Sequence, residues 1–313
     1  MVLIGLPFLV SSDYELHIFI MIFLYAFLAS GWNISGGYIG LHSFGHAAFV
    51  GVGAYTSTYL FLRCGLSPWL GMGVGAILAG CLGLVIGYLS IRYEVKGIYF
   101  TLITLAFAEI LRVLTLNLSF LGGPSGLLIP LKGNVPTLFQ FTQKAPFYYI
   151  SLLLLAMMLI FQCALRNSKT GYLFLAIREN ENASQALGIS LLRYKLLGIF
   201  LSASLVALGG SFWAQYFMYI EPQTIFGLWL SMEILIFAVV GGEGMILGPV
   251  LGAALLVPCS EFLRMFLGGG YQGMHLVVYG LILIVVVMFN PKGLAGLLQN
   301  CLPTRGGPKG AHA

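Results

Sequence analysis

The sequence predicts an all-α polytopic integral membrane protein, and three observations lead to that fold class. The 313 residues are 59% hydrophobic and only 8% charged, whereas a soluble domain has about 25% charged residues. The apolar runs are continuous, and about 20 such residues cross a bilayer as a helix; strands of a membrane barrel would alternate apolar and polar residues. The 41 glycines are typical of closely packed membrane helices, because glycine lets two backbones approach.

Nine apolar runs are candidate membrane segments, so we expect roughly eight to ten segments in all. The runs 48–62 and 227–241 are short for a spanning helix, and we expect them to be tilted, broken or re-entrant. In chain order the nine runs are residues 15–34, 48–62, 68–91, 97–117, 146–165, 195–219, 227–241, 246–266 and 272–289.

The runs form one domain with polar loops and a short tail. Residues 1–301 are expected to form a single transmembrane domain of many helices, some of which are broken or re-entrant. Between the fourth and fifth runs, residues 118–145 contain glycines and prolines typical of an ordered loop outside the membrane. The last residues, 302–313, are rich in glycine and proline, and we expect them to be disordered.

The longest polar interval, Leu165–Lys195, sets the orientation. It contains five basic residues and two acidic ones, and basic loops remain in the cytosol. We therefore place 166–194 in the cytosol. Strict alternation then places 118–145 on the extracytoplasmic side and the C-terminus in the cytosol. The net charge of +5 is explained by these loops, so nucleic acid is not an expected partner.

Within this interval, Ala176–Ile189 is predicted to form a short amphipathic helix. Small residues lie on one face and polar residues on another, and Gly188 is placed to end the helix. One interpretation is a helix that lies on the membrane surface. The other is a docking helix whose small residues fit a partner's groove. The small face has Ala183, Ala186, Leu187 and Ser190, and the polar face has Arg178, Glu181 and Gln185.

Two of the predicted spans contain carboxylates. Glu109 lies three residues before Arg112, so the pair is either part of a translocation path or an ion pair within one helix. Glu233 has no charged partner nearby in sequence; it could line a path, accept a hydrogen bond or face an interface. Ionisable residues inside a membrane are costly and are functional candidates for that reason.

Two glycine-rich stretches, one beginning at Gly36-Gly37 and the other at Gly241-Gly242, each precede an apolar run. Such breaks in corresponding positions often line the path of a transporter. In the first stretch, His42 and His46 have the spacing of two metal ligands on a helix, but no third ligand is evident. We interpret the stretch as a polar break in which Ser43 and His46 bind neighbouring helices or substrate.

Several kinds of chemistry find no support in the sequence. The glycine-rich loop at Gly122–Gly126 lacks the Lys-Ser/Thr of a phosphate-binding loop, so any ATP that drives transport, with its Mg²⁺, would be bound by another polypeptide. The five cysteines have no CxxC spacing. We find no nucleophile–base arrangement and expect neither catalysis nor a bound cofactor.

These stretches together resemble the permease subunits of bacterial ABC importers for branched-chain amino acids, in particular the LivM-like branch. The resemblance covers most of the chain. It rests on GWNISGGYIGLHSFGHAAFVGVGAYTS (31–57), GIYFTLITLAFAEILR (97–112), LGGPSGL (121–127), AIRENENASQALGIS (176–190), GGEGMILGPVLGA (241–253) and PKGL (291–294).

The resemblance implies a subunit of the bacterial inner membrane that works with a second homologous permease, two cytosolic ABC ATPases and a periplasmic or extracellular binding protein. It assigns contact with the ATPases to Arg178, Glu179, Asn180, Glu181, Ala183, Ala186 and Gly188. Candidates for the translocation path are Gly37, Ser43, His46, Glu109, Glu233, Gly241 and Gly242. Tyr172 and Ser184 depart from the family pattern, which has a basic residue and an alanine there; both are expected to tune which ATPase fits.

Other functions stay open from sequence. A related importer could carry urea, short amides or other amino acids. An ion-coupled secondary transporter could use Glu109 and Glu233 as its coupling sites. A structural scaffold for a sister permease is less compatible with glycine-broken spans, because a scaffold has no need of irregular backbone in lipid.

Overall fold

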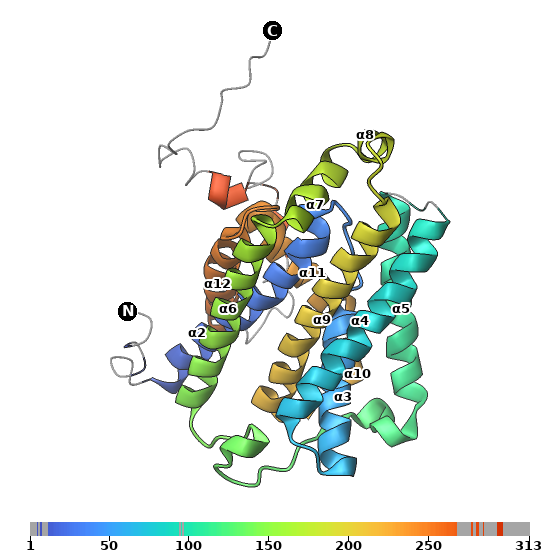
Figure 1. The fold of residues 1–313 in the computed structure, drawn as a ribbon. Coiled ribbons are helices and arrows are strands. Elements are labelled where there is room, and N and C mark those ends of the chain that lie inside the picture. The colour runs from blue at the N-terminus through green and yellow to red at the C-terminus, as the bar shows by residue number, and fades with distance from the viewer. Residues whose placement is uncertain are drawn as a thin grey trace.

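The computed structural model describes residues 12–93, 95 and 97–267, together with residues 5, 7, 277, 280, 281, 284 and 293–296. These residues form a bundle of long helices (Figure 1). The predicted span 272–289 lies almost wholly outside the described residues, and the tail 302–313 lies entirely outside them.

The long helices follow the predicted runs closely. They are α2 (Asp13–Asn33), α3 (His46–Cys64), α4 (Pro68–Arg92), α5 (Ile98–Asn117), α6 (Lys144–Arg166), α9 (Leu191–Phe217), α11 (Leu228–Gly242) and α12 (Gly248–Leu267). The shorter elements are the π-helix η1 (Ile34–Tyr38), the 3-10 turns η2 (Ser119–Leu121), η3 (Gly123–Ser125) and η4 (Pro136–Leu138), the helices α7 (Lys169–Glu179), α8 (Glu181–Ala186) and α10 (Pro222–Ile225), and the strands β1 (Leu127–Leu128) and β2 (Tyr219–Ile220).

Six helical stretches among the described residues are long and apolar enough to cross a membrane, which confirms the predicted fold class. The six are Asp13–Tyr38, Pro68–Arg92, Ile98–Asn117, Lys144–Arg166, Leu191–Phe217 and Pro222–Gly242. The last one is broken, because α10 ends at Ile225 and α11 begins at Leu228. The break thus lies at the start of the predicted run 227–241, and the rest of that run forms the continuous helix α11.

Helices α3, α4 and α9 pack against one another, and their backbones approach through glycine. A Cβ atom added to Gly53 would lie 2.8 Å from the Cα atom of Ala207, and one added to Gly210 would lie 2.8 Å from the carbonyl carbon of Val50. Real Cβ atoms do not approach that closely. The high glycine content thus serves helix packing, as small residues do in membrane proteins.

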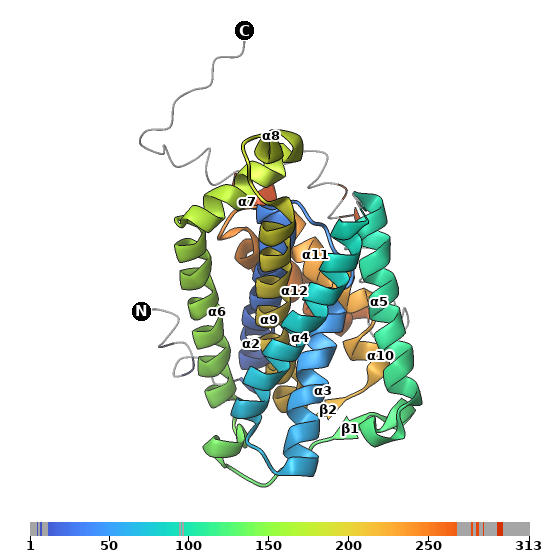
Figure 2. The ribbon, with the colours of Figure 1, turned by 45° about the vertical axis from the view of Figure 1, so that its right-hand side comes forward.

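The two polar loops lie at opposite ends of the bundle. Residues 118–145 are ordered at one end, where β1 pairs with β2 in antiparallel register and Leu127 faces Ile220 (Figure 2). Helices α7 and α8 lie at the other end (Figures 1 and 2). This arrangement agrees with the alternation inferred from the basic residues.

Candidate functional site

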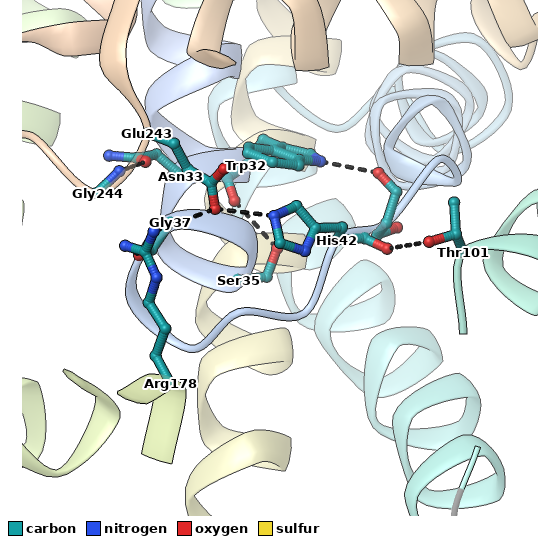
Figure 3. A network of polar contacts seen from close by, with 10 residues as sticks. Trp32, Asn33, Ser35, Gly37, His42, Thr101, Arg178, Glu243 and Gly244 are labelled. Atoms are coloured by element: carbon teal, nitrogen blue, oxygen red, sulfur yellow. Dashed lines mark hydrogen bonds and ion pairs between the residues drawn. The ribbon is translucent and has the colours of Figure 1, made fainter. Parts of the chain in front are cut away.

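The two glycine-rich stretches meet in space, although about 200 residues separate them. The first break begins where α2 turns into η1 and continues through residues 39–45 to the start of α3. The second is the turn of residues 243–247 between α11 and α12. They touch at Gly37 and Gly244, where a Cβ added to Gly37 would lie 2.6 Å from the Gly244 nitrogen. We call these segments the first break and the second break (Figure 3).

Asn33 joins the two breaks from the end of α2. Its Oδ1 accepts a hydrogen bond from the Gly244 nitrogen at 2.8 Å, and its Nδ2 donates to the Met245 carbonyl at 3.0 Å. Asn33 is fully buried, and these bonds give its amide both an acceptor and a donor role. Asn33 carries no signal of this role in the sequence, because the partners of its amide are 211 and 212 residues away.

Arg178 reaches both breaks from the last turn of α7. Its Nη1 donates to the carbonyl of Gly37, and its Nη2 lies 3.8 Å from the Glu243 carboxylate. The side chain passes over Gly40, where an added Cβ would lie 3.3 Å from the arginine Cγ. Figure 3 shows the guanidinium between the two breaks.

His42 and Glu243 form the second link between the breaks. His42 Nε2 lies 2.9 Å from Glu243 Oε1, the same oxygen that faces Arg178. This hydrogen bond raises the pKa of His42 above its ordinary value, because the carboxylate favours the charged imidazolium. Neither His42 nor Glu243 was expected to act in this way.

The first break is also tied to the start of α5. Thr101 Oγ1 donates to the His42 carbonyl at 2.9 Å, and the Phe44 nitrogen donates to Thr104 Oγ1 at 3.1 Å. These bonds satisfy backbone groups that the irregular chain leaves without helical partners. The helix that carries Glu109 is therefore attached to the same loop that Arg178 and Glu243 hold.

His46 and Ser43 lie deeper, where α3 begins. His46 Nε2 lies 2.8 Å from Ser202 Oγ on α9, and Ser202 donates to the Gly31 carbonyl at 2.7 Å. The Ser43 carbonyl accepts from the Trp32 indole at 2.8 Å. The expectation that these side chains bind neighbouring helices is confirmed for His46, whereas the Ser43 hydroxyl accepts from the Gly45 nitrogen at 3.2 Å within the first break. The described residues include no group of three or more His, Cys, Asp or Glu side chains able to hold a metal ion.

The two predicted carboxylates occupy separate places. Glu109 pairs with Arg112 on α5 through a 2.9 Å bond from the arginine Nε, and Arg112 also donates to Gln223 of α10 at 2.8 Å. The Glu109 side chain is 54% exposed. Glu233 accepts from the Tyr25 hydroxyl at 2.8 Å and borders a cavity of about 450 Å³ between α2, α9, α11 and α12.

Gly241 and Gly242 lie where α11 crosses the start of α12. A Cβ added to Gly241 would lie 2.5 Å from the Gly248 carbonyl carbon, and Gly242 has a φ of +124°, which favours glycine. Among the predicted path residues, Gly37, Ser43, His46, Gly241 and Gly242 thus lie in or beside the two breaks. Glu109 and Glu233 do not.

The predicted helix Ala176–Ile189 is wrong in one respect, because it is two helices. α7 ends at Glu179, and Asn180 is extended, with φ −157° and ψ 105°. The Asn180 side chain accepts from the Ala183 nitrogen at 3.0 Å and caps α8, which is the local bond that lets asparagine interrupt a helix. Gly188 has a φ of +82° beyond the end of α8, as its expected stopping role requires.

On α8 the predicted small face is open. Ala183 and Ala186 are exposed, and Leu187 is 82% exposed. Ser184 is only 3% exposed, so any influence on a partner would be indirect. The side chains of Arg178 and Asn180 are hydrogen-bonded within the chain, to Gly37 and Ala183, and are not part of the open face.

A buried ion pair anchors α8 to α9. Lys195 Nζ lies 2.6 Å from Glu181 Oε1, and the lysine side chain is only 6% exposed. A charge removed from water in this way needs its partner. The first residue of α8 is therefore fixed to the N-terminal end of α9.

Comparisons with known proteins agree with this architecture. The family model described as "Branched-chain amino acid transport system / permease component" matches residues 15–287. The chain is 29% identical to the high-affinity branched-chain amino acid transport system permease protein LivM of Escherichia coli K12, over 98% of the chain and 76% of that relative. It is 24% identical to a probable LivM permease of Methanocaldococcus jannaschii, over 87% and 90% of the two chains.

A shorter match is to a tyrosine transport system permease protein of Clostridioides difficile. That match has 30% identity and covers 50% of the chain and 49% of the relative. No solved structure matches the chain.

Proposed function

Because the chain belongs to the family of branched-chain amino acid transport permeases, we propose that it is the transmembrane permease subunit of an ATP-driven importer for branched-chain amino acids. The observation that carries this proposal is the family match over 273 of 313 residues, supported by near-complete coverage of the chain by LivM of Escherichia coli. We place the protein in the bacterial inner membrane with its C-terminus in the cytosol, since the basic segment 166–194 favours that orientation.

The open face of α8 supports docking to separate ATPases. Ala183 and Ala186 on the six-residue helix α8, together with Leu187 directly after it, form a small apolar surface. Such a surface fits a groove on a partner. The sequence holds no phosphate-binding loop, so ATP and Mg²⁺ are assigned to the partner subunits. The anchoring of α8 through Glu181 and Lys195 gives a rigid connection from that surface to α9.

The exposed face of α5 supports a translocation path shared with a second permease. Glu109 is 54% exposed near the middle of a helix long enough to span the membrane. A carboxylate at that depth is costly in lipid, even when it is paired with Arg112. A companion chain or an aqueous path over this face removes the cost. The surrounding exposed side chains are mainly apolar and suit aliphatic substrates: Leu102, Ile110, Val113 and Leu114.

The mechanism involves no covalent chemistry on this chain. A binding protein delivers the amino acid to the outer face, and ATP binding draws the two ATPases together. Movement of α8 then shifts this chain relative to its companion. Each nucleotide state selects the arrangement to which it binds more tightly, because a ligand shifts an equilibrium only by its differential affinity.

A second candidate is an importer for aromatic amino acids, because the half-length match to a tyrosine transport permease has 30% identity. The chemistry of recognition is similar in the two cases. An apolar path accepts the side chain in both cases, and polar groups along the path satisfy the charged ends of the amino acid.

Reconstitution tests the proposal. The chain is incorporated into proteoliposomes with its companion permease, both ATPases and the binding protein, and uptake of labelled leucine, isoleucine and valine is measured with and without ATP. We expect the three labelled amino acids to accumulate only when ATP is present. Unlabelled tyrosine and urea are added as competitors to define the range of substrates. The matched control is the chain alone under a proton or sodium gradient. Gradient-driven uptake by the chain alone would instead establish an ion-coupled transporter.

A further inference from the structure

Arg178 lies in the segment for which the family resemblance implies contact with the ATPases, but its side chain is directed into the molecule. The guanidinium donates to the Gly37 carbonyl and faces Glu243 at 3.8 Å, and the arginine side chain is 33% exposed. By contrast, Leu187 on the open face of α8 is 82% exposed. Arg178 is therefore placed to act on the two breaks.

The two contacts of Arg178 belong to different breaks. Gly37 is in the first break, which runs from α2 to α3, and Glu243 is in the second break, which joins α11 to α12. A single rigid guanidinium spans them. Arginine presents several donors in a fixed plane, so a movement of its base changes both contacts together. A lysine at the same position would carry the charge without this geometry.

The two breaks are held in a fixed position relative to each other by backbone contact and by hydrogen bonds. Gly37 and Gly244 are in backbone contact, and Asn33 pins the second break through Gly244 and Met245. The first break is in turn bonded to α5 through Thr101. A displacement at Arg178 is thus passed to both breaks and to the helix that carries Glu109.

The base of Arg178 is itself well held. Two residues of α7, Phe174 and Ile177, are completely buried, so α7 is packed against the bundle. Asn180 separates α7 from α8. The segment therefore has two parts, an outward helix with an open face and an inward helix whose last turn carries Arg178.

We propose that Arg178 is a positioning residue that passes movement of the cytosolic segment to the two breaks, acting through the Gly37 carbonyl and Glu243 and not through contact with an ATPase. This inference rests on the proposed function, since it concerns the coupling of ATP hydrolysis to transport. It assigns to Glu243 and the Gly37 carbonyl the role of the receiving contacts on the second and first breaks.

The test uses the complete reconstituted complex and three measurements: retention of the ATPases during purification, ATP hydrolysis, and leucine uptake. We expect Arg178→Ala to retain the ATPases and hydrolyse ATP, while uptake per ATP falls by about tenfold, a typical size for coupling between sites. Arg178→Lys should recover part of the loss through Glu243. Glu243→Gln is a second variant that should lower uptake per ATP in the same direction.

Two control variants define the comparison. Arg193 is an exposed basic residue of the same cytosolic segment with no hydrogen bond or ion pair to the residues that the structure describes, and Arg193→Ala should keep the normal uptake per ATP. Ala183→Trp places a bulky ring on the open face of α8, and it should strip the ATPases from the complex.

Two results would overturn the inference. Loss of the ATPases from the Arg178→Ala complex would make Arg178 a docking residue, and normal uptake per ATP in Arg178→Ala or Glu243→Gln would remove its role in coupling. If Arg178→Ala does not fold, the Glu243→Gln result decides alone. A wild-type complex that hydrolyses ATP without taking up any of the amino acids would contradict the proposed function, an outcome distinct from both.

Discussion

The amide of Asn33 holds the turn at Gly244: its Oδ1 accepts from the Gly244 nitrogen at 2.8 Å, and its Nδ2 donates to the next carbonyl at 3.0 Å. These two residues are 211 positions apart, at the end of α2 and in the turn between α11 and α12. Asn33 is completely buried, so water does not compete for these two hydrogen bonds. The meeting of the two breaks depends on this amide.

We predict that Asn33→Ala lowers stability more than any exposed asparagine replacement. It leaves the Gly244 N–H and the Met245 carbonyl without their partner, and each unpaired buried group costs about 1–3 kcal/mol. Thermal unfolding of the purified protein measures the loss. Asn167→Ala is the control, because Asn167 is exposed and its side chain hydrogen-bonds only to Cys163 among the described residues. Equal melting temperatures for the two variants would contradict the role of Asn33.

We predict that Gly37→Ala disrupts the site while Gly73→Ala does not. A Cβ on Gly37 would lie 2.6 Å from the Gly244 nitrogen, whereas a Cβ on Gly73 meets no atom within 4 Å. Both variants add one methyl group to a glycine in a helical segment. Uptake and thermal stability should therefore fall in Gly37→Ala and stay normal in Gly73→Ala. A stable, active Gly37→Ala protein would show that the two breaks can move apart without loss of function.

The long elements were predictable because their signal is local. Continuous apolar runs gave α4, α5, α6 and α9 to within a few residues, and their spacing required no knowledge of tertiary contacts. The break between α7 and α8 was missed, because Asn180 has ordinary helical neighbours and only its side-chain bond to Ala183 decides the interruption. Helix boundaries of this kind depend on capping that periodicity does not contain.

We predict that His42 contributes to stability mainly at acidic pH. The hydrogen bond with Glu243 raises the pKa of His42 above its ordinary value of 6.5 in the folded protein. A group with a raised folded-state pKa stabilises the protein fully below the unfolded pKa, and that contribution is lost as the pH rises through the folded pKa. The difference in melting temperature between wild type and His42→Gln should therefore be largest below about pH 6.5 and shrink at higher pH.

Two results would contradict this prediction: a difference that grows with pH, or one that does not change. Glu243→Gln provides the control, because it removes the carboxylate that causes the shift. In that variant, a further His42→Gln change should have little pH-dependent effect.

We predict that Lys195→Met loosens α8. The lysine side chain is 6% exposed and bonds to Glu181 at 2.6 Å, so its removal frees the first residue of α8 from α9. Amide hydrogen exchange over 181–187 should accelerate, while exchange over the centre of α9 stays slow. Glu179→Gln, which alters an exposed carboxylate beside α8, is the matched control. Unchanged exchange in the Lys195 variant would show that the pair does not anchor the helix.

The site itself was only partly predictable. The glycine-rich stretches were recognised as breaks because glycine patterns are visible in sequence, and His46 and Ser43 were recognised as polar residues inside them. The links that join the breaks were not, since Asn33, Arg178 and Glu243 meet only after segments some 65 to 210 positions apart fold together. Glu109 was ambiguous for a different reason: its pairing with Arg112 fits both interpretations.

In the proposed function, ATP hydrolysis by the partner subunits is coupled to this chain through α8 on the cytosolic side of the membrane. The most direct test of this placement is the accessibility of Ala183→Cys, in a background whose five native cysteines are replaced, to a thiol reagent that cannot cross the membrane. We predict labelling in inside-out vesicles and none in intact spheroplasts. Labelling from the outside of intact spheroplasts would place α8 on the extracytoplasmic face and contradict the account.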